Sequence, residues 1–196
     1  MLKSRLCIAF FAFAVGCAPA QKPLTDYVNP MLGTATLWDS VDLGFKPTKR
    51  TWGAEVFPGS SLPNAMVQVS PVTKFHSGAG YQYEDSVIYG FTHTNKGHWN
   101  LCHIPLLPVT GTPTPGDYCS PFSHERESAA PGYYQVFLDR YGVDAQLSST
   151  LRCAFHKYTY PAGAAASLLA DLQRSNEHVR AWDIRKEGDN VFAGWQ

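Results

Sequence analysis

Short strand-like runs interrupted by glycine and proline are the feature that most limits how this chain can fold. In residues 57–71 (FPGSSLPNAMVQVSP), two Pro-containing breakers lead into an alternating run at residues 65–70, which we expect Pro71 to end. Similar runs recur at residues 81–83, 86–92, 103–109, 133–138, 143–148, 151–160, 166–171, 178–186 and 190–195. Many short strands with turn residues between them predict an all-β fold, an antiparallel β-sandwich.

Helix is scarce in this pattern. Residues 162–172 have the best helix propensity of the chain. The small residues after Pro161 and the apolar pair Leu168-Leu169 fit a buried strand equally well. Both interpretations stay open at this stage.

Composition excludes some classes of partner. The formal net charge is zero and the 16 basic residues are scattered, so the sequence shows no electrostatic footprint for nucleic acid. Charged residues make up 16% of the chain, below the typical value of about 25%. A neutral surface rich in aromatic and hydroxyl groups suits a neutral polar ligand such as a sugar.

The first residues are typical of an export signal. Lys3 and Arg5 precede an apolar stretch, residues 6–15, which is too short to span a bilayer. Residues 14–17 resemble a bacterial lipobox with Cys17 as the lipidated residue, while residues 18–20 fit ordinary signal peptidase. We expect residues 1–20 to be a signal peptide, preferably of the lipoprotein type. The protein would then be exported by a bacterium to the periplasm, or held at the outer membrane or cell surface by its lipid.

Three cysteines would remain after processing: Cys102, Cys119 and Cys153. An odd number leaves at least one thiol free or paired with another chain. Cys153 alternates with Phe155 in a strand, so we expect a small buried side chain there. Cys102 and Cys119 are candidates for a disulfide in an oxidising compartment.

Five segments in one order carry a family resemblance. They are DYVNPMLGT (26–34), FPGSSLPNAMVQVSP (57–71), AGYQYEDSVIYGFTHT (79–94), PFSHERESAAPGYYQV (121–136) and FHKYTYP (155–161). In these segments the chain resembles the N-terminal domain of glycoside hydrolase family 92, the calcium-dependent exo-acting α-mannosidases. The resemblance covers nearly all of the chain after the signal.

The resemblance implies a galactose-mutarotase-like sandwich over residues 26–196, as the first domain of a larger two-domain enzyme. It implies hydrolysis of α-mannosidic linkages in glycans by inversion. The catalytic acid and base, and the chief calcium ligands, would lie in a helical-barrel domain absent from these residues. The expected partners are therefore a mannose-containing glycan and that C-terminal catalytic domain.

The last residues predict a hairpin that turns at residues 187–189 and returns to Trp195. Because this pattern does not resemble the end of a domain, we expect the sequence to be a truncated fragment that is inactive alone. A stand-alone carbohydrate-binding module and a non-functional truncation product are the alternatives.

The loop at residues 93–100 has the composition of a recognition surface, and the resemblance implies that it faces the catalytic cleft. We expect Trp99 to offer an apolar platform to a pyranose ring, with His93, His98 and Asn100 bonded to its hydroxyls. In the alternative interpretation, His93 bonds a neighbouring backbone group and Trp99 packs between strands.

Three further residues complete the predicted substrate-binding set. Trp52 and Phe57 lie just before the turn at Pro58-Gly59, where an aromatic side chain can project into a cleft. Gly59 would let the backbone approach a ligand closely. Core packing is the alternative for both aromatic side chains.

No catalytic or metal-binding residue is predicted within the chain. The spacing of His93, His98, Cys102 and His103 matches no common zinc pattern, and no EF-hand-type calcium loop occurs. Residues 120–134 are expected to form a structural loop. The local acidic residues are expected to be solvated turn or edge residues: Glu84, Asp85, Glu125, Glu127, Asp139 and Asp144.

Overall fold

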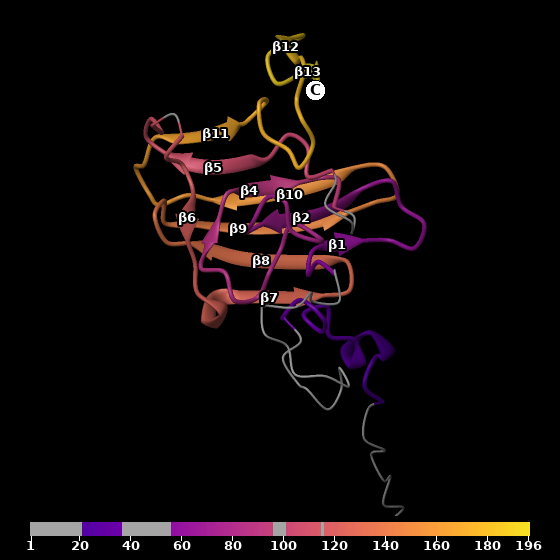
Figure 1. The fold of residues 1–196 in the computed structure, drawn as a ribbon. Coiled ribbons are helices and arrows are strands. Elements are labelled where there is room, and N and C mark those ends of the chain that lie inside the picture. The colour runs from indigo at the N-terminus through magenta and orange to yellow at the C-terminus, as the bar shows by residue number, and fades with distance from the viewer. Residues whose placement is uncertain (1–20, 37–55, 96–100, 115) are drawn as a thin grey trace, which may run out of the picture.

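Two antiparallel sheets form the body of the molecule (Figure 1). The computed structural model describes residues 21–36, 56–95, 101–114 and 116–196. The larger sheet has the strand order β1 (Ser60–Ser61), β2 (Gln68–Val72), β4 (Gly90–Thr92), β5 (Leu106–Thr110) and β11 (Ala166–Ala170). The smaller sheet has the order β10 (Ala154–Thr159), β9 (Val143–Ser149), β8 (Tyr133–Leu138) and β7 (Glu127–Ala130). The predicted β-sandwich is confirmed.

Alternation along the strands builds the core between the sheets. In β8 every second residue is buried, and the inward set is Tyr134, Val136 and Leu138. These side chains pack with Phe91 and Leu107 of the larger sheet in one apolar cluster. A period of two therefore places one face of each sheet against the other, as in sandwiches generally.

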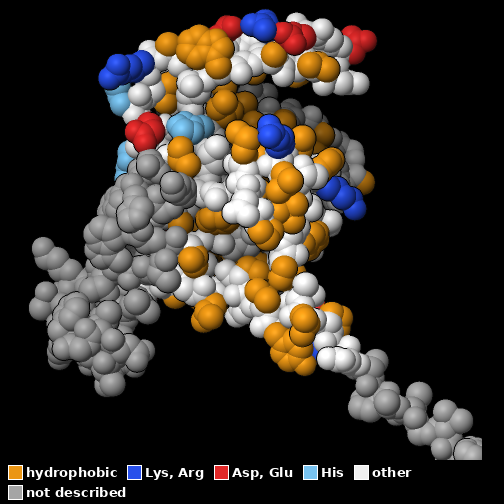
Figure 2. Space-filling view, turned by 90° about the vertical axis from the view of Figure 1, so that its right-hand side faces the viewer, with side chains coloured by type: hydrophobic (Ala, Val, Ile, Leu, Met, Phe, Trp, Pro, Cys, Tyr) orange, Lys and Arg blue, Asp and Glu red, His pale blue; other side chains and the backbone are white. Residues whose placement is uncertain are grey.

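Two small sheets and two short 3₁₀ helices complete the described fold. Strands β3 (Val87–Ile88) and β6 (Ser120–Pro121) pair with each other, and β12 (Asp183–Lys186) forms a hairpin with β13 (Phe192–Trp195). The helices are η1 (Leu24–Tyr27) and η2 (His124–Arg126). The hairpin stands beyond β5 and β11 in Figure 1, and Figure 2 shows charged side chains along its outer edge with apolar ones between them.

The prediction that Pro71 ends its strand is wrong. Strand β2 continues through Pro71 to Val72, and Pro71 lies opposite Phe91 of β4. Strand β1 pairs only with Gln68 and Val69, so β2 has no strand partner on that side at Pro71. Proline is tolerated where a strand has such a free edge, because the missing N–H then removes no ladder bond.

Two predicted strands have a different structure. Residues 81–83 form no strand, because the Thr73 hydroxyl accepts the Gln82 N–H at 2.9 Å in place of a ladder bond. The single run expected at residues 86–92 is divided between β3 and β4, which belong to different sheets. Tyr89 lies between them and donates its N–H to Val72 O at 2.9 Å.

The segment expected to be a structural loop, residues 120–134, contains regular structure. It holds β6, η2 and β7, followed by the first residues of β8. Residues 162–172, left open between helix and strand, contain β11, in which Leu168 is half exposed. The strand interpretation is therefore right, but this strand is not fully buried.

Both cysteine predictions are wrong. Cys102 and Cys119 are free thiols, and Cys153 is exposed. Cys102 lies in a buried polar setting, with its Sγ 3.5 Å from Asn176 Nδ2. Cys153 precedes β10 in a turn, where Thr150 accepts its N–H, so it does not take part in the alternation of that strand.

Candidate functional site

His93 directly follows β4 and is hydrogen-bonded to a second imidazole. Its Nε2 lies 2.7 Å from Nε2 of His156 on β10, so the N–H of one ring donates a hydrogen bond to the other ring. The hydroxyl of Tyr158 lies 2.6 Å from Nδ1 of His156. Since β4 and β10 belong to different sheets, this chain of three side chains joins the sandwich across its layers.

Burial makes this pair resistant to protonation. It lowers the pKa of His93, and it lowers the pKa of His156 to about 4, with the neighbouring His93 as the second cause. Burial also raises the pKa of Tyr158, so this phenol stays protonated and can donate a hydrogen bond to His156 Nδ1. The His156 Nε2–H then points to His93, and both rings are neutral near pH 7.

The predicted substrate residues that the structure describes lie near one another. Gly59 directly precedes β1, and a Cβ built there would lie 2.0 Å from Val69 O of β2. The missing side chain therefore makes room for the neighbouring strand. On the other side of β2, Gln68 donates its N–H to His93 O at 2.9 Å, and Phe57 is half-buried just before Gly59.

Contact between these three residues and a sugar remains a prediction. Trp52, His98, Trp99 and Asn100 lie outside the described residues, as does Cys17. In the part of the chain that is described, no helix is long and apolar enough to cross a membrane.

Glu127 is buried, which corrects its assignment as a solvated turn residue. It opens β7, and its side chain is 2% exposed. Its carboxylate accepts bonds from the hydroxyls of Tyr81 (3.0 Å to each oxygen) and Tyr134 (2.5 Å), and lies 2.5 Å from His124 Nδ1.

This carboxylate serves the fold. Burial, and then the negative charge of Glu127, raises the pKa of both Tyr81 and Tyr134, which keeps their protons on the phenols. The hydroxyls are therefore donors at all ordinary pH values. Through the bonds from Tyr81, Glu127 holds residues 81–83 against the smaller sheet. Protein groups already surround its carboxylate, which leaves little room for a ligand.

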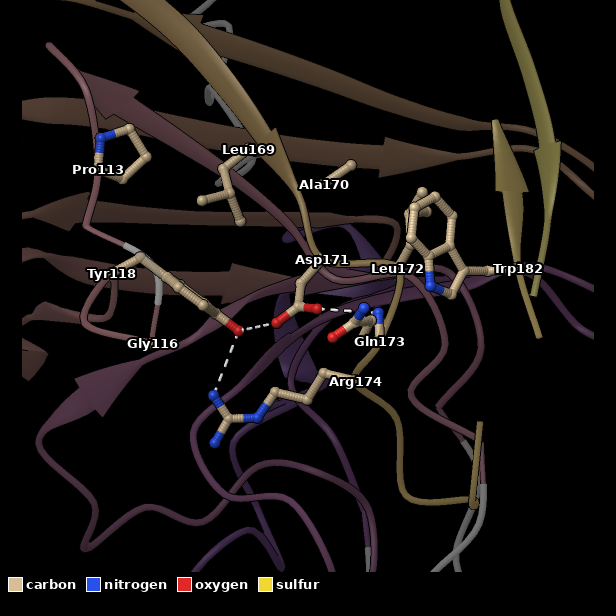
Figure 3. Close-up of a pocket in the computed structure, with 10 residues that line it drawn as sticks. All are labelled: Pro113, Gly116, Tyr118, Leu169, Ala170, Asp171, Leu172, Gln173, Arg174 and Trp182. Atoms are coloured by element: carbon tan, nitrogen blue, oxygen red, sulfur yellow. Dashed lines mark hydrogen bonds between the residues drawn. The ribbon is translucent and has the colours of Figure 1, made fainter. Parts of the chain in front are cut away.

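An open cavity of about 530 Å³ lies where β11 leaves the larger sheet (Figure 3). Its lining residues are Pro113, Gly116, Tyr118, Leu169, Ala170, Asp171, Leu172, Gln173, Arg174 and Trp182. Figure 3 shows the Asp171 carboxylate between the Tyr118 hydroxyl and the Trp182 indole. Sequence reasoning missed this site, because no motif brings Tyr118 next to a residue at the end of β11.

A short polar chain crosses the cavity. The Tyr118 hydroxyl donates to Asp171 Oδ2, and the Gln173 N–H donates to Asp171 Oδ1 at 3.0 Å. Arg174 Nη1 donates to the Tyr118 oxygen at 3.2 Å. Burial, together with the bond to Asp171, raises the pKa of Tyr118 to about 12, so the phenol stays protonated.

Arg174 is held in place by aromatic rings. Its guanidinium carbon lies 4.6 Å from the ring centres of both Phe75 and Tyr89. Such cation–π contacts fix a long side chain that would otherwise sample many rotamers. The cavity therefore offers a carboxylate and a guanidinium at fixed positions, with apolar side chains beside them.

Comparisons with known proteins identify relatives of the chain. Residues 27–196 match the family described as the glycosyl hydrolase family 92 N-terminal domain. No curated protein matches the sequence.

Solved structures of this family share the fold. The family GH92 alpha-mannosidase BT3965 from Bacteroides thetaiotaomicron, in complex with mannoimidazole, is 29% identical with a TM-score of 0.75, over 88% of this chain and 23% of its own length. The family GH92 inverting mannosidase BT2199 from the same organism is 26% identical with a TM-score of 0.60, over 77% of this chain and 20% of its own. The chain thus spans about a quarter or less of these structures.

Proposed function

We propose a function from one premise: the chain belongs to glycoside hydrolase family 92. In this proposal it forms the N-terminal β-sandwich of an exported α-mannosidase that cleaves α-mannosidic linkages of glycans by inversion. The observation that carries the proposal is the family match over residues 27–196. The α-mannosidase structures that share the fold support it.

The proposed role of this domain is to shape the substrate site. Inverting hydrolysis needs an acid and a base about 6.5–9.5 Å apart, with room for water between them. Glu127 is the most buried carboxylate described above, and its oxygens are taken up by Tyr81, Tyr134 and His124. We propose, from the family resemblance, that the catalytic acid and base belong to a helical-barrel domain outside residues 1–196.

Sugar contacts from this chain are proposed at the loops named from the sequence. They are Trp52, Phe57, Gly59, His93, His98, Trp99 and Asn100. The short path from Gly59 across β2 to His93 supports a shared role for the members of this set that the structure describes. Lipidation at Cys17 would keep the enzyme at a bacterial surface.

Calcium, which the family resemblance implies, has no cluster of acidic ligands in the described part of this domain. Among residues 21–36, 56–95, 101–114 and 116–196, no three His, Cys, Asp or Glu side chains are placed to share an ion. Oxygen-rich cages of six to eight ligands are what calcium requires. We propose, from the family resemblance, that calcium is held mainly by the catalytic domain, and no step here depends on it.

An activity assay tests this division of roles. The purified chain is incubated with 4-nitrophenyl α-mannoside and calcium, and we expect no release of nitrophenol. A matched sample carrying Glu127→Gln controls for a contaminating mannosidase. Turnover that purifies with the parent chain and disappears in the variant would overturn the proposal, because it would place catalysis within this domain.

A further inference from the structure

We infer that the cavity between Tyr118, Asp171 and Trp182 is an additional saccharide-binding site that takes a neutral pyranose of the mannose type. The choice of mannose rests on the function proposed above. The site itself rests on the cavity in Figure 3. None of Phe57, Gly59 and His93 lines it.

The apolar half of the cavity can receive the C–H face of a sugar ring. Trp182 is 43% exposed, although an indole usually gains most by being buried. Its ring borders the cavity beside Leu172, and Leu169 with Pro113 lies on the other side of Asp171 in Figure 3. A pyranose that enters would cover apolar surface on both sides. A cavity of about 530 Å³ is within the usual range for small-molecule sites, about 300–1,000 Å³.

The polar half matches hydroxyl groups. Each Asp171 oxygen accepts one bond from the protein and keeps a second lone pair. The guanidinium of Arg174 donates one hydrogen bond to the Tyr118 hydroxyl, and its other N–H groups have no hydrogen-bond partner among the described residues. The Tyr118 hydroxyl lies between this acceptor and this donor. Sugar hydroxyls, each of which can both donate and accept, suit such a row of polar groups.

Charge balance favours a neutral ligand. The carboxylate of Asp171 and the guanidinium of Arg174 offset each other, so neither an anion nor a cation gains a net attraction from this pair. Both groups are positioned before a ligand arrives, Asp171 by two hydrogen bonds and Arg174 by two aromatic rings. Preorganised polar groups lower the cost of ordering on binding.

A titration followed by NMR tests the site. The chain has five tryptophans, so each indole N–H gives a separate signal that single Trp→Phe variants can assign. Methyl α-mannopyranoside and an α-linked mannobiose are the probes, and methyl β-galactopyranoside is the comparison sugar. We expect the Trp182 signal to shift saturably with the mannose probes.

Substitutions separate this site from the rest of the surface. Trp182→Ala should weaken binding roughly tenfold, as the loss of an aromatic platform does. Trp195→Ala is the matched control, because Trp195 is exposed on the hairpin that directly follows Trp182 but lines a different cavity with His103 and Arg180. Asp171→Asn keeps the shape and should also weaken binding, while thermal unfolding monitors the fold.

The outcomes are distinct. A saturable Trp182 shift that is kept in Trp195→Ala and weakened in Asp171→Asn supports the inference. Shifts confined to the signals of Trp52 or Trp99 overturn it and leave the proposed function standing. If no indole responds to any mannose probe, the inference fails, while the proposed function is tested separately by the activity assay.

Discussion

The buried imidazole pair gives a stability that depends on pH in a calculable way. His156 has an ordinary pKa of 6.5, which the fold lowers to about 4. Between pH 6.5 and about 4, His156 is therefore protonated in the unfolded chain but not in the folded chain. Stability contributed by the neutral pair is present above pH 6.5 and is lost as the pH falls toward 4.

The magnitude follows from the two pKa values. Between about pH 7.5 and pH 5, proton binding by unfolded His156 should reduce the free energy of unfolding by about 2 kcal/mol. His93, whose pKa is also lowered, adds to the loss in the same direction. Urea unfolding at a series of pH values, followed by tryptophan fluorescence, measures this slope.

Two variants identify its source. His156→Gln replaces the ring with an amide that does not titrate, so we expect a less stable chain whose stability falls less steeply below pH 6.5. His178→Gln alters an exposed histidine and should leave the parent slope unchanged. If His156→Gln keeps the full slope, the buried pair is not the origin and the reasoning fails.

Three further outcomes can be checked with purified protein. Tyr134→Phe removes one bond to the Glu127 carboxylate and should cost about 1.5–3 kcal/mol, a fall in Tm of roughly 3–12 °C by calorimetry; an unchanged Tm would mean that the network adds no stability. Gly80→Ala should destabilise the fold, because a Cβ there would lie 2.7 Å from Cys102 Sγ and φ is +79°; equal chevron plots for parent and variant would contradict this. In the native chain at about pH 8, a thiol reagent should label exposed Cys153 quickly and reach Cys102 only on unfolding, because burial raises the Cys102 pKa to about 11 and the thiolate is the reactive form. Peptide mapping measures the order of labelling, and rapid labelling of Cys102 would contradict this expectation.

The sequence predicted well those strands whose partners are their neighbours in the chain. Strand β8 was expected at residues 133–138 and lies there, because its alternation matches a face that is buried along its whole length. Strand β9 was expected one residue short of its end. Alternation is a local property, so it can be read without knowledge of the partner strand.

The errors arose where a distant residue decides the local structure. Pro71 looked like a strand end, but the short β1 leaves it a free edge. Glu127 looked solvated, but Tyr81 reaches it from a segment far away in the chain. Neither partner is visible in a local pattern.

The candidate site could be predicted only in part, for the same reason. His93 was singled out from its loop, while its partner His156 was not, since β4 and β10 meet only in the folded sandwich. The cavity at Tyr118 and Asp171 likewise joins two distant segments. A site built from residues that are distant in the sequence cannot be predicted from any local sequence pattern.

The strand order also sets the sequence of events by which the chain can fold. Strands β7 to β10 are consecutive neighbours, so this sheet closes through short loops alone. The larger sheet is complete only when β11 pairs with β5, which places Ala166 opposite Thr110. All four strands of the smaller sheet lie between these two strands in the sequence. Closing that long loop costs entropy before any contact repays it, so β11 should join last. Until it does, β5 is an open edge that can pair with the strands of other chains.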